Sequence, residues 1–359
     1  MWKEVLLNYG IFLLELLTVF GIIIAIVMMV LESKKQGQQG EISVKNLTEK
    51  YKESKKSLSN FFLSEAEQKA KEKADKKEQK AKVKAEKKRL KLAKKSQEES
   101  EGEQSEVVKP RLFVLNFNGD IMASGVDCLR KEIDAVVALA RPEHDEVLLK
   151  LESPGGVVHG YGLAASQLAR LKARNIPLTI AVDKVAASGG YMMACVADKI
   201  ISAPFAVIGS IGVVAQVPNI HRLLKKHDVD VDVMTAGKYK RTVTLMGENT
   251  KAGKKKFQQE LEETHKLFKQ FISQYRPQLD MRKVATGEHW FGKQALELKL
   301  VDEISTSDDA ILTVIEEKDV IEVKFIQKKN VLKRFGIELE QSVERIIAKL
   351  LNKSHSSML

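Results

Sequence analysis

Residues 146–204 read "EVLLKLESPGGVVHGYGLAASQLARLKARNIPLTIAVDKVAASGGYMMACVADKIISAP", and this stretch decides the fold. Its segments "EVLLKLES", "IPLTIAV" and "KIISAP" are short and apolar, which indicates buried strands. The segments between them, "YGLAASQLARLKAR" and "SGGYMMACVA", are typical of helices. Strand and helix therefore alternate, and this alternation predicts an α/β domain.

The same alternation continues on both sides of this stretch. Upstream, residues 111–117 ("RLFVLNF") predict a strand and residues 124–140 predict a helix. Downstream, residues 229–237 ("VDVDVMTAG") predict another strand, and residues 251–275 predict a long amphipathic helix. We therefore expect a single α/β domain over residues 110–310.

The amino-terminal part of the chain has the features of a membrane anchor. Residues 11–31 are apolar at all but two positions, and as a helix they span about 30 Å, the thickness of a bilayer's hydrocarbon core. A cleaved signal peptide would begin with basic residues and end at a small-residue cleavage site, whereas here Lys3 is offset by Glu4. The sequence predicts an uncleaved transmembrane anchor over residues 1–32.

A charged spacer is expected to separate this anchor from the domain. The formal net charge is +11, and residues 34–95 alone hold 21 Lys and Arg against 9 Asp and Glu. The rest of the chain is therefore close to neutral, so the charge does not require a nucleic-acid partner. Residues 33–109 are predicted to be a Lys/Glu-rich spacer and linker, as a solvated helix or a disordered stalk.

The lysines that follow the span favour a cytoplasmic carboxyl-terminal side by the positive-inside rule, although long domains can override that rule. Residues 311–359 form a carboxyl-terminal extension to which the sequence assigns no role. The two cysteines, Cys128 and Cys195, lie far apart in apolar or mixed surroundings, which argues against a disulfide framework. No motif indicates a metal or another cofactor, and no phosphate-binding glycine loop indicates an ATPase.

One serine stands out within the fold-deciding stretch. In "AASGGYM" at 186–192, Ser188 lies between two alanines and two glycines, at the predicted start of a helix. A serine that attacks a carbonyl needs a base for its proton and N–H donors for the oxyanion that forms. The N–H of Gly189 can serve as one donor, and "ESPGG" at 152–156 can expose a second at the end of a strand.

The base is less clear from the residues alone. The sequence lacks the G-x-S-x-G elbow of the α/β-hydrolases, and none of its seven histidines has a spacing that singles it out. A lysine can act as the base when burial disfavours its charged form. "TAGKYKR" at 235–241 offers two candidates, Lys238 and Lys240, and spacing does not choose between them.

Four blocks in order resemble the signal peptide peptidase A family of membrane-bound serine peptidases. They are "ESPGG", "KVAASGGYMMACVADKIISAPFAVIGSIGV", "GKYKR" and "TGEHWFGKQALELKLVDEI", and they span most of residues 111–305. The resemblance implies a fold like that of the Clp protease and crotonase group, with repeated β-β-α units. The blocks occur once, so the chain is expected to hold one catalytic unit.

The resemblance also assigns roles to individual residues. It implies that Ser188 is the nucleophile and that Lys240, the second lysine of its block, is the base. It implies that Ser210 of the "GSIGV" block supports the lysine and that Gly156 and Gly189 supply the oxyanion donors. Arg241 departs from the family, whose members usually follow this lysine with an aspartate or a small residue, and the departure puts fine specificity in doubt more than chemistry.

Two functions from different classes are open at this point. The favoured one is a serine endopeptidase of the bacterial inner membrane, single-pass, that cleaves signal peptides or unfolded membrane-derived chains. The resemblance further implies a homo-oligomeric ring of eight copies. The alternative is a non-catalytic or acyl-CoA-binding domain, because two oxyanion donors also suit thioester enolates. That chemistry needs neither the serine nor the lysine.

Overall fold

The computed structural model describes residues 40–64 and 109–327, together with positions 17, 18, 20, 21, 67, 80 and 84. Almost all of the predicted anchor, much of the spacer and the end of the extension lie outside the described residues. The chain forms two compact units, Val44–Lys324 and Met1–Ser43 with Phe325–Leu359. Among the helices described here, none combines the length and the apolar character that crossing a bilayer requires.

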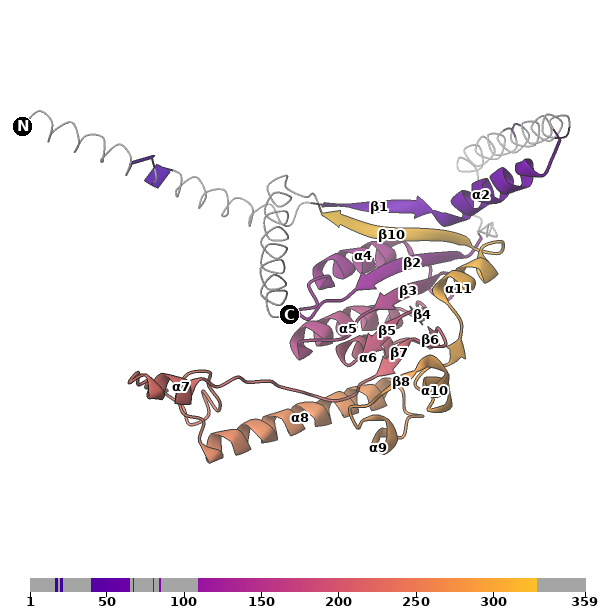
Figure 1. The fold of residues 1–359 in the computed structure, drawn as a ribbon. Coiled ribbons are helices and arrows are strands. Elements are labelled where there is room, and N and C mark those ends of the chain that lie inside the picture. Colours follow the sequence, from indigo (N-terminus) through magenta and orange to yellow (C-terminus); the bar gives the residue numbers. More distant parts are fainter. Residues whose placement is uncertain are drawn as a thin grey trace, which may run out of the picture. The chain divides into compact units, whose positions relative to one another are not determined.

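The large sheet is the centre of the fold (Figure 1). Its seven strands lie in the order β1-β10-β2-β3-β4-β6-β9, and the pairings from β10 to β9 are all parallel. Parallel strands need apolar side chains on both faces, which explains the unbroken apolar runs in the sequence. The strands are β1 (Gly40–Asn46), β2 (Arg111–Asn118), β3 (Glu146–Glu152), β4 (Leu178–Val182), β6 (Lys199–Ser202), β9 (Glu303–Ile304) and β10 (Asp319–Gln327).

A small sheet stands beside it, with strands β5 (Val185–Ala187), β7 (Val207–Gly209) and β8 (His289–Phe291) in that order. β5 follows β4 after two residues, so the chain steps directly from the large sheet into the small one. Helix α6 (Gly189–Ala194) then follows β5 after a single residue. The succession β4, β5, α6 is a β-β-α unit of the expected kind.

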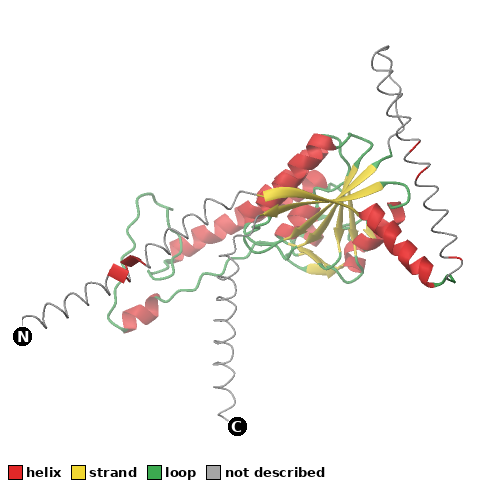
Figure 2. Cartoon of the chain, turned by 90° about the horizontal axis from the view of Figure 1, so that it is seen from above, coloured by secondary structure: helices red, strands yellow, loops and turns green. Residues whose placement is uncertain are grey.

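Helices cover both faces of the large sheet (Figure 2). Leu115 and Leu149 on one face belong to the same apolar cluster as helices α4 (Val126–Leu139), α5 (Val158–Lys172) and α6. Val114 and Leu148, one residue earlier in each strand, point to the other face. There they join helices α2 (Leu47–Phe61) and α11 (Ser307–Val314).

An arm projects from this core. It consists of residues 213–250 with the short helix α7 (His221–Lys226), and the amino-terminal end of α8 (Lys251–Tyr275) projects with it (Figure 1). The bounds of α8 are those the sequence predicts. The strand predicted at 229–237 is wrong, because these residues form a largely exposed loop. Its Val/Asp alternation has no neighbouring strand to pair with. Helices α9 (Met281–Val284) and α10 (Gly292–Glu297) follow α8.

Two segments outside the expected domain take part in its sheet. β1 and α2 fall inside the predicted spacer, yet the Thr48 hydroxyl of α2 accepts a 2.9 Å hydrogen bond from the backbone N–H of Val320 in β10. β10 in turn falls inside the predicted extension, yet Ile321 pairs with Phe113 of β2. Among the described residues, the strands of the large sheet therefore extend from residue 40 to residue 327. The polar, alternating composition of β1 and its charged flanks conceal this in the sequence.

Candidate active site

Ser188 occupies a strained turn between β5 and α6. Its backbone has φ +51° and ψ −117°, a region that residues with a side chain rarely adopt, at a cost of about 1–3 kcal/mol. The surrounding backbone holds it there. The Ser188 N–H donates to the carbonyl of Gly209 at 2.8 Å, and the N–H of Ala187 donates to the carbonyl of Ser153 at 3.0 Å. The turn places the serine at the surface of a cavity rather than inside the helix.

The "ESPGG" loop lies directly against this turn. Gly155 has φ +88°, and a Cβ atom there would lie 2.7 Å from the nitrogen of Gly189 and 2.8 Å from the Cβ of Ser188. A Cβ atom on Gly156 would overlap the carbonyl of Ile121. Gly155 therefore lets the loop approach the serine, and Gly156 lets it pass close to the backbone of Ile121.

Two backbone amides beside Ser188 are free to bind an oxyanion. Gly189 is the first residue of α6, and its N–H has no carbonyl within the helix to bond. In the described part of the chain, neither this N–H nor that of Gly156 donates to another group of the protein. Both residues line the same cavity as Ser188. Together with Ser210, described below, the structure thus brings four of the five residues that the sequence singles out to one cavity.

The cavity has a volume of about 780 Å³. Apolar side chains make up much of its wall, among them Ile121, Val157, Met192 and Phe268. Apolar walls with a few convergent polar groups are the usual composition of a binding pocket. The cavity can therefore take up apolar groups next to Ser188.

Ser210 lies on the wall of the same cavity. Its backbone is also left-handed, with φ +50°, and its N–H donates to the carbonyl of Glu288 at 2.7 Å. Two residues later, the N–H of Gly212 donates to the Ser210 carbonyl at 2.9 Å. This tight loop presents Ser210 to the space that Ser188 faces.

Lys240 lies elsewhere. It is exposed in the loop of the projecting arm, where its N–H donates to the carbonyl of Gly237 at 3.1 Å. Lys238 is exposed as well, with its ammonium 5.3 Å from the ring centre of Tyr239. Neither lysine lines the cavity of Ser188. A single copy of the chain in this conformation therefore does not bring the predicted base to the predicted nucleophile.

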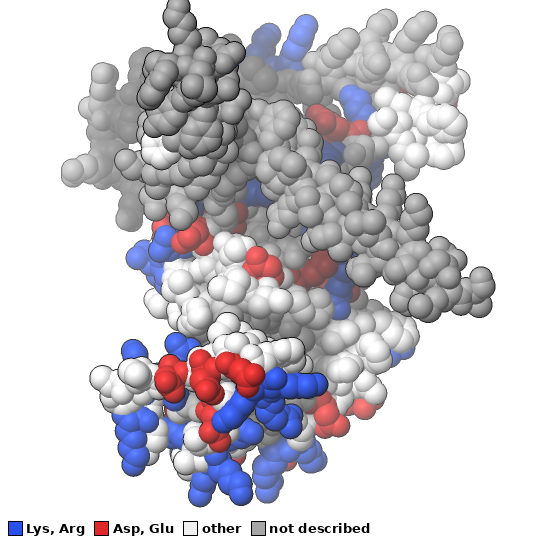
Figure 3. Space-filling view, turned by 60° about the vertical axis from the view of Figure 1, so that its left-hand side comes forward, with Lys and Arg blue, Asp and Glu red and all other residues white. Residues whose placement is uncertain are grey.

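Charged side chains of both signs cover the arm (Figure 3). Residues 213–256 hold ten Lys and Arg against four Asp and Glu, so this part of the fold is basic, although the chain from residue 96 onward is close to neutral as a whole. An excess of cations on one projection favours contact with acidic surfaces or with carboxylates of another chain.

Sequence reasoning missed His265 on α8. Its ring lines the cavity, and Nε2 donates to the carbonyl of Ile211 at 3.2 Å, next to Ser210. No spacing in the sequence could have indicated this contact, because 54 residues separate the two partners. Among the described residues, no three His, Cys, Asp or Glu side chains are grouped so that they could hold a metal ion.

Cys195 is not an alternative nucleophile. It is fully buried in α6's surroundings, and burial raises the pKa of its thiol well above its usual range. A thiol in that state stays protonated and inert. Ser188, at the turn before α6, lines the cavity, whereas Cys195 does not.

Comparison with known proteins identifies the family of this chain. Residues 170–321 match peptidase family S49, and residues 4–168 match the amino-terminal region of peptidase family S49. A chain from Haemophilus influenzae named "Probable protease SohB" is 59% identical over 98% of each chain. One of the same name from Buchnera aphidicola subsp. Schlechtendalia chinensis is 47% identical, over 86% of this chain and 99% of that one.

A solved structure of a membrane-bound stomatin-specific protease is also similar, with 14% identity and a TM-score of 0.37. The likeness covers 58% of this chain and 85% of that chain.

Proposed function

The chain belongs to peptidase family S49 and is a serine peptidase, and from this premise we propose that Ser188 is its nucleophile and Lys240 its general base. The observation that carries the proposal is the strained turn at Ser188, which faces a cavity beside two unpaired backbone amides. Because the family consists of peptidases, we do not retain the alternative of a non-catalytic or acyl-CoA-binding domain.

The proposed reaction follows from these groups. Neutral Lys240 takes the proton of the Ser188 hydroxyl, and Oγ attacks the carbonyl carbon of the scissile bond. The carbonyl oxygen becomes an oxyanion that accepts hydrogen bonds from the N–H groups of Gly156 and Gly189. When the C–N bond breaks, Lys240 gives its proton to the leaving amine. Water, deprotonated by Lys240, then hydrolyses the acyl-enzyme and restores Ser188.

Ser210 has a supporting role in this proposal. Ser210 lines the same cavity as Ser188, and its hydroxyl can hold the ammonium of Lys240 there or pass its proton. The proposal gives Ser210 no covalent step, and its loss should slow the reaction without abolishing it.

Lys240 must reach this cavity from the arm. We propose that a second copy of the chain supplies it, in the homo-oligomeric ring that the family resemblance implies. Two observations support a role for the arm in assembly: it projects from the core, and it exposes apolar side chains such as Val214 and Met234, the latter 90% exposed. A ring also closes a substrate groove that one copy leaves open.

The substrates that fit this site are extended peptides. Signal peptides and unfolded fragments of membrane proteins have the required small or apolar residues, and we propose that a single-pass anchor over residues 11–31 holds the domain at the bacterial inner membrane, near such fragments. An anchor raises the local concentration of the enzyme where these peptides are released.

The base is tested by comparing Lys240→Ala with Lys238→Ala in the detergent-solubilised full chain. The general base takes the serine proton, so its loss should lower kcat/KM. Lys240→Ala should lose most of this activity, by about 100-fold or more, because general-base catalysis supplies about 10²–10⁴-fold. Lys238→Ala removes a lysine that is also exposed and lies two residues away, and this variant should keep most of the activity. If Lys238 proves essential and Lys240 dispensable, the base is Lys238 and the proposal is wrong.

A further inference from the structure

We propose that Tyr161 is a positioning residue of the oxyanion hole, one that holds both of its halves without touching the substrate. The inference rests on the proposed roles of Ser188, Gly156 and Gly189. Tyr161 lies near the start of α5, is fully buried, and is not part of the cavity wall. Any effect it has on catalysis must therefore pass through the backbone that it supports.

The hydroxyl of Tyr161 holds the loop that carries Gly156. The N–H of Gly155 donates to Ser153 Oγ at 3.1 Å, Ser153 Oγ lies 2.5 Å from Tyr161 Oη, and Tyr161 Oη donates to the carbonyl of Asp120 at 2.8 Å. A carbonyl can only accept and an amide N–H can only donate. The single proton of Tyr161 is thus committed to Asp120, so Ser153 must donate its own proton to Tyr161.

This chain of bonds determines which amide of the loop is left over. Because the Gly155 N–H is bonded to Ser153 Oγ, it turns away from the reacting carbonyl, and the N–H of Gly156 is the one that remains unpaired. Loss of the Tyr161 hydroxyl would leave the buried Ser153 hydroxyl without its acceptor. Because an unpaired buried donor is costly, this hydroxyl would turn to another acceptor. The loop, and the amide of Gly156 with it, would then lose its fixed orientation.

The ring of Tyr161 supports the other half of the oxyanion hole. A Cβ atom on Gly189 would overlap the Cγ and Cδ2 atoms of this ring, so the ring packs directly against the backbone of the first residue of α6. One side chain therefore touches the supports of both donors, by its edge and by its hydroxyl. Burial raises the pKa of Tyr161, so the hydroxyl stays protonated and keeps its role as donor.

The test is Tyr161→Phe in the full chain. A chromogenic peptide gives kcat and KM, and a fluorophosphonate gives the rate at which Ser188 forms a covalent adduct. The ring stays, so Gly189 keeps its support, and only the loop is released. We expect kcat to fall about tenfold or more with little change in KM, since removal of one complete oxyanion donor costs about 10²–10³. Ser153→Ala should give a similar loss, and the double variant should lose no more than either single variant.

The matched control is Tyr191→Phe. Tyr191 is also fully buried, and its hydroxyl also donates to a backbone carbonyl, that of Leu300, at 2.8 Å. It should lower Tm about as much as Tyr161→Phe while leaving kcat unchanged. Equal kcat values for the two Tyr→Phe variants would overturn the positioning role, and so would a Tyr161→Phe loss that appears only in KM. Full activity of Ser188→Ala would instead refute the proposed function itself. If Tyr161→Phe does not fold, Ser153→Ala alone decides by the same criteria.

Discussion

At the scale of single residues, the site depends on positions that have no side chain. Gly155 brings one loop within contact of Ser188, Gly156 lets that loop pass the backbone of Ile121, and Gly189 makes room for the ring of Tyr161. Ser188 itself adopts a conformation that only a tightly bonded neighbourhood can maintain. The conformation of the serine is therefore set by the backbone around it.

This dependence predicts that Gly156→Ala abolishes peptide cleavage. The added methyl group would overlap the carbonyl of Ile121, so the loop must move and take its N–H away from the oxyanion. The matched control is Gly162→Ala in α5, where nothing lies within 4 Å of the new Cβ atom. That variant should keep full turnover and gain about 0.5–1 kcal/mol of stability from the helix. Peptide turnover and thermal unfolding of both variants check the prediction, and an active Gly156→Ala enzyme would show that the loop tolerates displacement.

The sequence predicts part of this site and not the rest. Ser188 and Gly189 can be found because the nucleophile and its donor are adjacent in the chain, and a known family selects Lys240. Tyr161 cannot be found in this way, because its role arises from a contact with Ser153 and another with Gly189, each made only by the fold.

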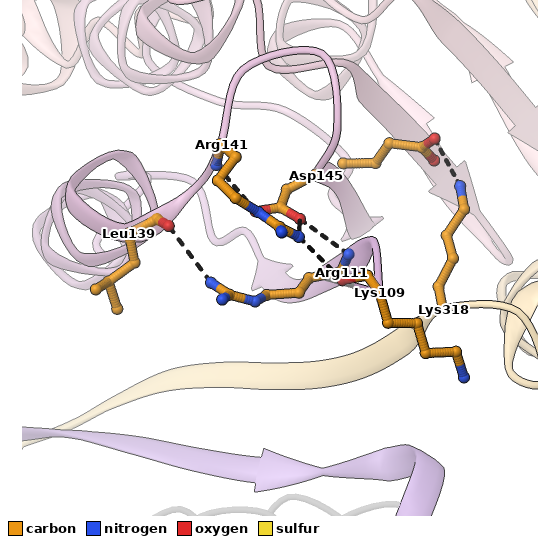
Figure 4. A network of polar contacts seen from close by, with 7 residues as sticks. Lys109, Arg111, Leu139, Arg141, Asp145 and Lys318 are labelled. Atoms are coloured by element: carbon orange, nitrogen blue, oxygen red, sulfur yellow. Dashed lines mark hydrogen bonds and ion pairs between the residues drawn. The ribbon is translucent and has the colours of Figure 1, made fainter. Parts of the chain in front are cut away.

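At the scale of elements, a buried carboxylate joins three segments at one end of the large sheet (Figure 4). Asp145 accepts from the side chain of Arg141 at 2.6 and 3.0 Å and from the backbone N–H of Arg111 at 2.9 Å. Arg141 also donates to the carbonyl of Lys109 at 2.9 Å. The start of β2, the segment after α4 and the start of β3 are thereby held in register.

Asp145→Asn is predicted to lower the free energy of unfolding at pH 7 by about 1.5–3 kcal/mol, the range for hydrogen bonds to a charged group. Burial alone would raise the pKa of Asp145, but the hydrogen bonds from Arg141 and Arg111 outweigh it, so the pKa lies below its ordinary value of 3.8. The carboxylate therefore stabilises the fold above about pH 4, and this contribution is lost as pH falls through the lowered pKa.

Urea unfolding at pH 7 and at pH 3 tests this sign, because the difference between wild type and Asp145→Asn should shrink at the lower pH. The control is Asp308→Asn, whose exposed ion pair with Lys150 should be worth no more than about 1 kcal/mol. A difference that grows on acidification would mean that Asp145 is not held in its charged form.

The sequence predicts most elements between residues 111 and 305, since apolar periodicity is strong there. α8 has the predicted bounds because its apolar stripe, with Phe268 and Ile272 buried, is long and regular. β1 and α2 are missed because their pairing with distant β10 and their packing beside α11, rather than local pattern, make them fold. The strand wrongly predicted at 229–237 shows the converse, a β-like pattern without a partner.

At the scale of the whole molecule, the arm separates the two proposed catalytic residues. If a second copy supplies Lys240, a mixture of Ser188→Ala and Lys240→Ala chains must regain activity that neither has alone. In a randomly mixed ring with head-to-tail contacts, about one quarter of the sites would then combine an intact serine with an intact lysine. Turnover of chains mixed in detergent and reassembled measures this. No recovery, from chains shown by light scattering to have mixed, would place Lys240 and Ser188 in the same copy.

The sequence has no phosphate-binding glycine loop of an ATPase that could unfold substrates, and this predicts the kind of substrate. A recessed site without an ATPase reaches only chains that are already extended, so the solubilised enzyme should cleave a signal-peptide mimic and an unfolded casein-like chain. A stable globular protein should resist. Its hydrolysis at a comparable rate, without ATP or denaturant, would show that access does not limit the enzyme.

The central claim is that Ser188 carries the covalent step, and one measurement tests it most directly. The full chain is treated with a fluorophosphonate, and the modified peptide is located by mass spectrometry, with Ser188→Ala treated in parallel. The account predicts one adduct, on Ser188, and none on the variant. An adduct on another residue, or labelling of Ser188→Ala equal to that of wild type, would contradict it.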